Sequence, residues 1–154
     1  MKDPLTAGDI CTRIVTIVYP SMAVGEAARL LREHHVGSLV VVEEASPDQR
    51  VVVGMLTDRD IALGVVAADR DPHGMRVGDI MSRDVLTARE QDSVLDLLAS
   101  MRRKGVRRIP VTDARGTLIG IVALDDVLEI VAQEMQAVAS AVGASQKHEQ
   151  AALP

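Results

Sequence analysis

The chain contains an internal repeat, and this duplication restricts its fold more than any other feature of the sequence. Residues 7–11 (AGDIC) resemble residues 77–81 (VGDIM), and the alignment continues without a gap, at a separation of 70 residues, as far as Glu43 and Asp113. Beyond these residues the separation is 66, since Gly54 matches Gly120. The first copy therefore carries four extra residues within EEASPDQR, a polar stretch that predicts a lengthened hairpin turn. We expect two copies of one structural unit.

Each copy has the pattern of a β-α-β-β-α unit. Short apolar stretches predict first strands over 14–18 and 84–87, and Ser21 and Asp92 are plausible N-caps of the helices that follow. Three- and four-residue spacing predicts the apolar faces of these helices, formed by Val24, Ala27, Ala28 and Leu31, and by Val94, Leu95, Leu97, Leu98 and Met101. The remaining strands are expected over 37–42, 51–56, 108–112 and 117–123, with second helices starting near Asp58 and Asp125. The expected fold class is α/β (α+β), with two units that share a core.

The repeat also predicts the domain organisation. The first unit is expected over residues 7–68, a linker over 69–76, and the second unit over 77–131. A C-terminal extension covers 132–154. Apolar spacing predicts an amphipathic helix over about 125–142, which suits contact between two copies in a homodimer, and the residues after it are expected to be frayed or disordered.

Composition excludes several classes of protein. Cys11 is the single cysteine, so no intrachain disulfide or cysteine-based zinc cluster can form. The net charge of −5 and the near absence of aromatic residues, Tyr19 alone, disfavour nucleic-acid binding. No apolar run approaches the roughly 18 residues of a membrane span, and no signal peptide is visible. A cytoplasmic protein is the default expectation.

The segments VGSLVVVE…GMLTDRDIAL and VRRIPVTD…GTLIGIVALDDVL resemble the tandem cystathionine-β-synthase (CBS) domain pair. The resemblance extends from residue 7 to about residue 131, and the chain looks like a stand-alone bacterial CBS-pair protein. It implies two units packed by pseudo-twofold symmetry into one module. It also implies clefts between the units that bind adenosine-containing ligands, without catalysis.

The family's Ser/Thr-x-x-Asp motif is complete at Thr57–Asp60, whereas Ala123–Asp126 keeps the aspartate and lacks the hydroxyl. A carboxylate at such a strand-to-helix junction can accept hydrogen bonds from two ribose hydroxyls, and a threonine hydroxyl with the free helix-start amides can hold a phosphate oxygen. The resemblance implies a main cleft formed by Thr57, Arg59, Asp60, Met81, Ser82, Leu86, Thr87, Val106, Arg107 and Arg108. It implies a second, weaker cleft formed by Cys11, Thr16, Ile17, Val36, Gly37, Ser38, Ala123 and Asp126.

Arg107 and Arg108 precede a buried strand, and guanidiniums are rarely buried without partners. Within the main cleft they would face the phosphates of AMP, ADP or ATP, because the arginine fork makes paired bonds to phosphate oxygens. Aspartates near the phosphate could also bring Mg²⁺ to the site, although no protein metal site is expected. The alternatives are structural: an exposed strand edge for the arginines, and a simple helix cap for Thr57 and Asp60.

Two classes of function remain open from the sequence. The first is a regulatory module that senses an adenosyl ligand, which the sequence does not identify among AMP, ADP, ATP, NAD and S-adenosylmethionine. The second is a constitutive dimerisation or scaffold module without a ligand, acting through the 125–142 helix. An unidentified protein partner fits either class. Cys11 is expected to be a small apolar contact, with a redox role as the alternative.

Overall fold

The computed structural model describes residues 4–153. After the short helix α1 (Ala7–Ile10), the first unit contains β1 (Ile17–Val18), α2 (Val24–Glu33), β2 (Ser38–Ser46), β3 (Gln49–Thr57) and α3 (Asp58–Ile61), which continues as the π-helical turn η1 (Ala62–Val66). Strand β1 pairs with β2 in parallel, and β2 pairs with β3 in antiparallel orientation. The sheet order is therefore β1-β2-β3.

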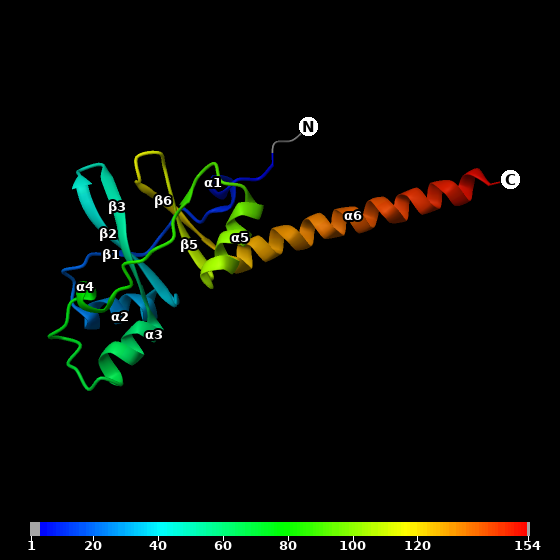
Figure 1. The fold of residues 1–154 in the computed structure, drawn as a ribbon. Coiled ribbons are helices and arrows are strands. Elements are labelled where there is room, and N and C mark those ends of the chain that lie inside the picture. The colour runs from blue at the N-terminus through cyan, green and yellow to red at the C-terminus, as the bar shows by residue number, and fades with distance from the viewer. Residues whose placement is uncertain (1–3, 154) are drawn as a thin grey trace.

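The second unit repeats this arrangement (Figure 1). It contains α4 (Val77–Ile80), β4 (Ala88–Arg89), α5 (Val94–Lys104), β5 (Arg108–Thr112), β6 (Leu118–Ala123) and α6 (Leu124–Ala152). Its sheet has the order β4-β5-β6 with the same parallel and antiparallel pairings. The expected fold class, two β-α-β-β-α units in one module, is confirmed.

Contacts between the two units come in equivalent pairs, as a pseudo-twofold axis requires. The bridge between Met55 and Ser82 corresponds, through the 66- and 70-residue separations of the repeat, to the bridge between Ile121 and Thr12. The Ala23–Arg76 bridge likewise corresponds to the Ser93–Thr6 bridge. Val51 pairs with its own equivalent, Thr117, so the axis passes between these two residues.

The two units exchange their leading segments. Ala7 of α1 is fully buried in a core made otherwise of second-unit residues, including Leu97 and Ile109. In return, Val77 of α4 and the following Met81 are buried with the first-unit residues of the other main core. In Figure 1, accordingly, α1 lies beside α5 and β6 rather than beside its own sheet. Each core is therefore completed by the other copy.

Several local predictions need correction. The first strands are Ile17–Val18 and Ala88–Arg89 rather than 14–18 and 84–87, and Ile14 is 93% exposed. The N-caps are Ala23 and Ser93 instead of Ser21 and Asp92. In the second unit, the Ser93 side chain accepts a hydrogen bond from the Asp96 amide. The Asp92 side chain accepts one from the Arg89 amide instead of capping the helix. Leu95 is 75% exposed, although the rest of its predicted face is at least partly buried.

The largest difference concerns the C-terminus. Helix α6 continues for 29 residues to Ala152, so the segment after residue 142 is helical rather than frayed. The physical reason is its composition: alanine, glutamine, glutamate and lysine, all favourable in helices, dominate 144–152. In the described part of the chain, no helix has both the length and the apolar character needed to cross a membrane.

The four extra residues of the first copy lengthen the strands of the β2–β3 hairpin, so the prediction of a lengthened turn is wrong. Strands β2 and β3 each contain nine residues, against five and six in β5 and β6. Pro47 and Asp48 form the turn between them.

Candidate functional site

A cavity of about 700 Å³ lies where the two sheets meet, at the starts of β2 and β5 and the ends of β3 and β6. Residues of both units line it: Gly37, Ser38, Met55, Thr57, Asp58, Arg59, Asp60, Ser82, Asp84, Val85, Leu86, Gly105, Val106, Arg107, Arg108, Ala123, Leu124 and Asp125. Its volume suits a small molecule of nucleotide size.

Strand register explains why these side chains meet. Ser38 at the start of β2 is the cross-strand partner of Thr57, and Arg108 at the start of β5 is the cross-strand partner of Ala123. These two pairs are equivalent in the repeat. The two halves of the cavity thus have the same backbone but different chemistry, two hydroxyls on one side and a guanidinium with a methyl group on the other.

The Thr57–Asp60 motif forms a capping box at the start of α3. The Asp60 amide donates to Thr57 Oγ1 at 3.1 Å, and the Thr57 amide donates to Asp60 Oδ2 at 2.9 Å. The Arg59 amide donates to Asp58 Oδ1 at 2.8 Å, and the Asp58 amide donates to the Gly37 carbonyl at 3.0 Å. The prediction that free helix-start amides hold a phosphate is therefore wrong for residues 58–60. The Thr57 hydroxyl proton and Asp60 Oδ1 remain available within the described chain.

The equivalent motif of the second unit is a partial cap. The Ala123 amide donates to Asp126 Oδ2 at 3.1 Å, and alanine offers no hydroxyl in return. Asp126 does not line the cavity.

Arg107 precedes β5 and Arg108 is its first residue, and their side chains have different surroundings. Arg107 Nη2 lies 3.8 Å from Asp125 Oδ1, and both side chains are more than three-quarters exposed, so this ion pair contributes little to stability. Arg108 is exposed and has no ion pair among the described residues. Both arginines line the cavity, but Arg107 is partly compensated by Asp125 of its own unit, whereas Arg108 is not compensated by any described residue.

The charge of the cavity wall is mixed. Three arginines, Arg59, Arg107 and Arg108, are accompanied by Asp58, Asp60, Asp84 and Asp125. Lys104, at the end of α5, lies 3.9 Å from Asp84. Such a wall can accommodate a polar ligand that carries both hydrogen-bond donors and a charged group, rather than a polyanion alone.

One polar atom at the cavity is unsatisfied. The hydroxyl oxygen of Ser38 is buried and has no hydrogen-bond partner in the described chain. A buried hydroxyl without a partner costs about 1–3 kcal/mol. A ligand would remove this cost only if the wall around Ser38 opened, because the oxygen is not exposed to the cavity.

The two units are in close backbone contact next to the cavity. Met55 and Ser82 exchange two backbone hydrogen bonds, of 3.0 and 2.9 Å. Gly54 lies so close to Met81 that a Cβ built on the glycine would be 2.7 Å from the Met81 sulfur. At the equivalent place, a Cβ on Gly120 would be 2.6 Å from Cys11 Sγ. Met81 and Cys11 therefore contact the other unit's β-strand, which agrees with the apolar-contact reading of Cys11.

Eight of the ten residues expected in the main cleft line this cavity. Neither Met81, which is buried, nor Thr87, which is exposed, lines it. Three residues expected in the second cleft, Gly37, Ser38 and Ala123, line this same cavity, whereas the others do not: Cys11, Thr16, Ile17, Val36 and Asp126. Residues that were expected in two separate clefts therefore line one cavity in part.

The sequence interpretation missed some lining residues, chiefly Met55, Asp84, Leu124 and Asp125. Met55 precedes Thr57 by two residues on one strand, so the two share a face and strand periodicity could have identified it. Asp84 lies in an irregular segment where no periodic signal exists.

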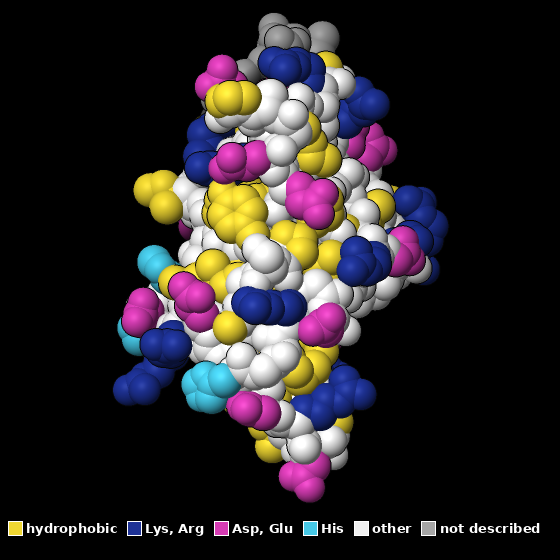
Figure 2. All heavy atoms as spheres, turned by 90° about the vertical axis from the view of Figure 1, so that its left-hand side faces the viewer, with side chains coloured by type: hydrophobic (Ala, Val, Ile, Leu, Met, Phe, Trp, Pro, Cys, Tyr) yellow, Lys and Arg dark blue, Asp and Glu magenta, His cyan; other side chains and the backbone are white. Residues whose placement is uncertain are grey.

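A metal site and a nucleic-acid interface are the alternatives to a small-molecule cavity. Residues 4–153 contain no group of three or more His, Cys, Asp or Glu side chains that could hold a metal ion. Figure 2 shows the face formed by the first unit, where positive and negative side chains are interspersed.

A protein-family model for the CBS domain matches residues 7–66 and 77–133, in register with the two structural units. The chain belongs to the CBS-domain family. The CBS domain-containing protein YhcV of Bacillus subtilis is 40% identical over 118 residues, which cover 77% of this chain and 79% of YhcV. An uncharacterized protein of Methanopyrus kandleri is 35% identical over 126 residues, covering 82% of this chain but only 62% of that protein.

Solved structures share the fold. An uncharacterized conserved protein from Pyrococcus horikoshii superposes with a TM-score of 0.71 at 30% identity, covering 85% of this chain and 95% of that one. The CBS domain pair of protein MJ0100, in complex with 5′-methylthioadenosine and S-adenosyl-L-methionine, superposes with a TM-score of 0.73 at 25% identity. The superposition covers 86% of this chain and 99% of the MJ0100 pair. This CBS pair therefore has the architecture of a module that binds adenosyl ligands in a relative.

Proposed function

We propose that this CBS pair is a non-catalytic regulatory module whose cavity binds one adenosine-containing small molecule. The observation that carries the proposal is a cavity of about 700 Å³, lined by both units, whose wall includes the Asp60 carboxylate, the Thr57 hydroxyl and the exposed Arg108 guanidinium. The complex of the MJ0100 pair with two adenosyl ligands supports the same ligand class here.

Asp60 is the proposed ribose contact. Its Oδ2 holds the helix start, which fixes the carboxylate in place, while Oδ1 can accept from a ribose hydroxyl. Thr57 can donate its hydroxyl proton to the ligand while it still accepts from the Asp60 amide. The capping and binding roles are thus compatible, since they use different atoms of the same two side chains.

Arg108 is the proposed contact to the charged group of the ligand. It lines the same cavity as the Thr57–Asp60 motif, and its fork can make paired bonds to phosphate or carboxylate oxygens. Arg107 can join it, because an exposed 3.8 Å ion pair with Asp125 is weak enough to be exchanged for a ligand phosphate. With the helix-start amides already engaged, the arginines are the main cationic donors proposed for this role.

The proposed response passes through α6. Leu124 and Asp125, in the first turn of this helix, line the cavity, and the helix continues for 29 residues in all. A ligand can shift the module only by its difference in affinity between two arrangements. Ligand contact with the start of α6 provides such a difference if the helix has two orientations.

A thermal-shift panel with AMP, ADP, ATP, NAD and S-adenosylmethionine, with and without Mg²⁺, tests the proposal. At least one ligand is expected to stabilise the parent chain by mass action. Arg108→Ala and Asp60→Asn are each expected to lower its affinity about tenfold to a hundredfold, since a hydrogen bond to a charged group is worth about 1.5–3 kcal/mol.

Matched controls are available for both variants. Arg103→Ala removes an exposed arginine that does not line the cavity, and Asp126→Asn alters an equivalent helix-capping aspartate outside it. Both controls are expected to bind like the parent. Equal losses in Asp60→Asn and Asp126→Asn would mean that the aspartate acts only as a cap, which would contradict its proposed ribose contact.

A second candidate function is a constitutive scaffold without a ligand. The long helix α6, most of which extends beyond the two units, favours it. If no ligand of the panel stabilises the parent chain while two copies still associate, the scaffold function is the correct one.

A further inference from the structure

Helix α6 carries an apolar seam that its own chain leaves uncovered. Leu128, Val131, Met135, Val138 and Val142 follow one another at spacings of three, four, three and four residues. This is the heptad a/d pattern of a coiled coil. Leu124, in the first turn of α6, lies four residues before Leu128 and belongs to the same pattern. Val131 is partly packed against the second core, but Leu128, Met135, Val138 and Val142 are 52–68% exposed.

Most of the residues that flank the seam are small. Ala132, Ala139 and Ala141 occupy three of the four e and g positions over 128–142, where coiled coils commonly carry charges, and Glu134 occupies the fourth. Glu134 is the one charged residue between Ile130 and Gln146. Two copies of this surface can therefore approach closely with little like-charge repulsion, so the seam is complementary to itself.

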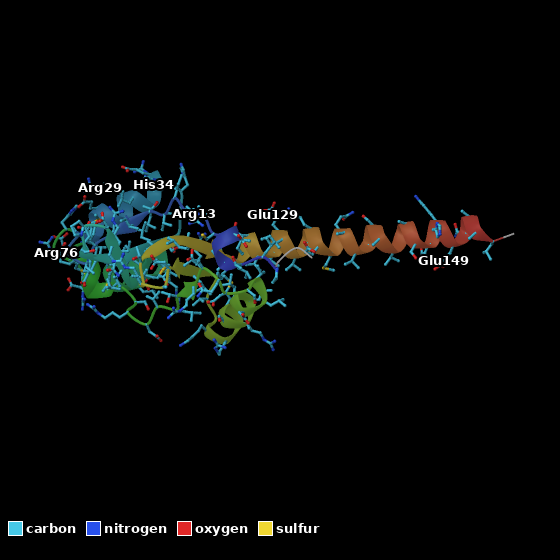
Figure 3. All side chains as sticks on the ribbon, turned by 90° about the horizontal axis from the view of Figure 1, so that it is seen from above. Arg13, Arg29, His34, Arg76, Glu129 and Glu149 are labelled. Carbon is cyan, nitrogen blue, oxygen red and sulfur yellow. The ribbon has the colours of Figure 1, made fainter. Side chains whose placement is uncertain are left out.

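The geometry of the molecule leaves room for a second copy. In Figures 1 and 3, α6 extends away from the two units, and no other described element lies alongside its C-terminal half. At about 1.5 Å per residue the helix is about 43 Å long. A single solvated helix of this kind is only marginally stable in water, whereas a paired one gains stability from its packed seam.

The seam also lies largely outside the region shared with the family. The family match ends at residue 133, so Met135, Val138 and Val142 belong to the extension. Three of the four most exposed seam residues are thus a feature of this chain rather than of the CBS fold.

We propose that two copies of this chain associate through α6, by pairing their 128–142 seams as a two-stranded coiled coil. The partner is a second copy because the surface is self-complementary in spacing, size and charge. This pairing does not depend on whether the cavity binds a nucleotide. It also differs from association through the body of the CBS units, because most of its contacts lie beyond residue 133, where the family match ends.

The test combines sedimentation velocity with hydrogen exchange of the full chain over a hundredfold range of protein concentration. We expect a concentration-dependent dimer, with amide protection over 132–146 that rises as the dimer forms. The double variant Met135→Glu/Val138→Glu places charges in the seam and is expected to reduce that protection at least tenfold at equal concentration. The control, Gln133→Glu/Ser140→Glu, adds the same charge on the opposite side of α6 and is expected to behave like the parent.

Three results would overturn the proposal. The first is a monomer at every concentration. The second is equal protection of 132–146 in the seam and control variants, even where the chain dimerises through its CBS units. The third is recruitment of a monomeric parent chain to phosphatidylcholine/phosphatidylglycerol vesicles that the seam variant does not bind, which would assign the seam to a lipid surface. Ligand stabilisation in the thermal-shift panel is unaffected by all three, so the two proposals fail separately.

Discussion

Two glycines allow the CBS units to approach each other at backbone distance. Gly54 on β3 lies against Met81 and Ser82, and Gly120 on β6 lies against Cys11 and Thr12. A Cβ at either position would be 2.9 Å from a backbone carbonyl oxygen, a distance that real Cβ atoms essentially never show. Because the obstacle includes backbone, the neighbouring segment cannot simply rotate away. Glycine at these positions is therefore a packing requirement, since neither has a positive φ.

Gly54→Ala and Gly120→Ala are expected to lower the free energy of unfolding by about 1–3 kcal/mol each, the usual cost of adding a methyl group to a packed interior. Gly143→Ala is the matched control, because nothing lies within 4 Å of a Cβ at that helical position. There alanine should favour the helix by about 1 kcal/mol locally. Urea unfolding compares the three variants. Stability of Gly54→Ala equal to that of the parent would contradict the packing described here.

Among helices, strands and turns, the predictions from the sequence were most accurate where the residue types alone determine the backbone conformation. The turn Asp113–Gly116 forms between β5 and β6 as expected: Asp113 Oδ1 accepts from the Arg115 and Thr117 amides, and Gly116 has a φ of +81°. The backbone hydrogen bond from Thr117 lowers the pKa of the Asp113 carboxyl. The strands β2, β3, β5 and β6 were predicted to within a few residues for a similar reason, since their apolar runs have few alternatives.

Elements whose form depends on tertiary contacts were predicted less well. The first strands contain two residues each, and their length is set by pairing with β2 and β5 rather than by their own apolar run. The helix-start amides of α3 are engaged by Thr57 and Asp58, which the motif alone did not reveal. The full length of α6 was missed because chain termini without apolar periodicity are commonly disordered, whereas the residues of this end also favour a helix.

For the whole molecule, the exchange of leading segments makes the two units depend on each other. Ala7 is 0% exposed in the second core, and Val77 is 0% exposed in the first. Neither core can therefore remain intact when the other copy unfolds. The cavity is formed at the same junction, so its shape depends on both cores.

Unfolding of the chain is accordingly expected to be one cooperative transition. Calorimetry should give a van 't Hoff enthalpy equal to the calorimetric enthalpy. Ala7→Asp places an unpaired charge in the second core, and it should accelerate hydrogen exchange in β2 of the first unit as well as in β5. Two separate transitions, or acceleration confined to β5, would show that the units are independent.

The central claim is that the two halves of the duplicated chain form one unequal ligand cavity, with Asp60 on one side and Arg108 on the other. Isothermal titration calorimetry, with the most stabilising nucleotide of the thermal-shift panel, tests it most directly. We predict one binding site per chain in the parent and in Arg103→Ala, and a loss of affinity of at least tenfold in Arg108→Ala. Two equal sites per chain, or binding that Arg108→Ala leaves unchanged, would contradict the claim.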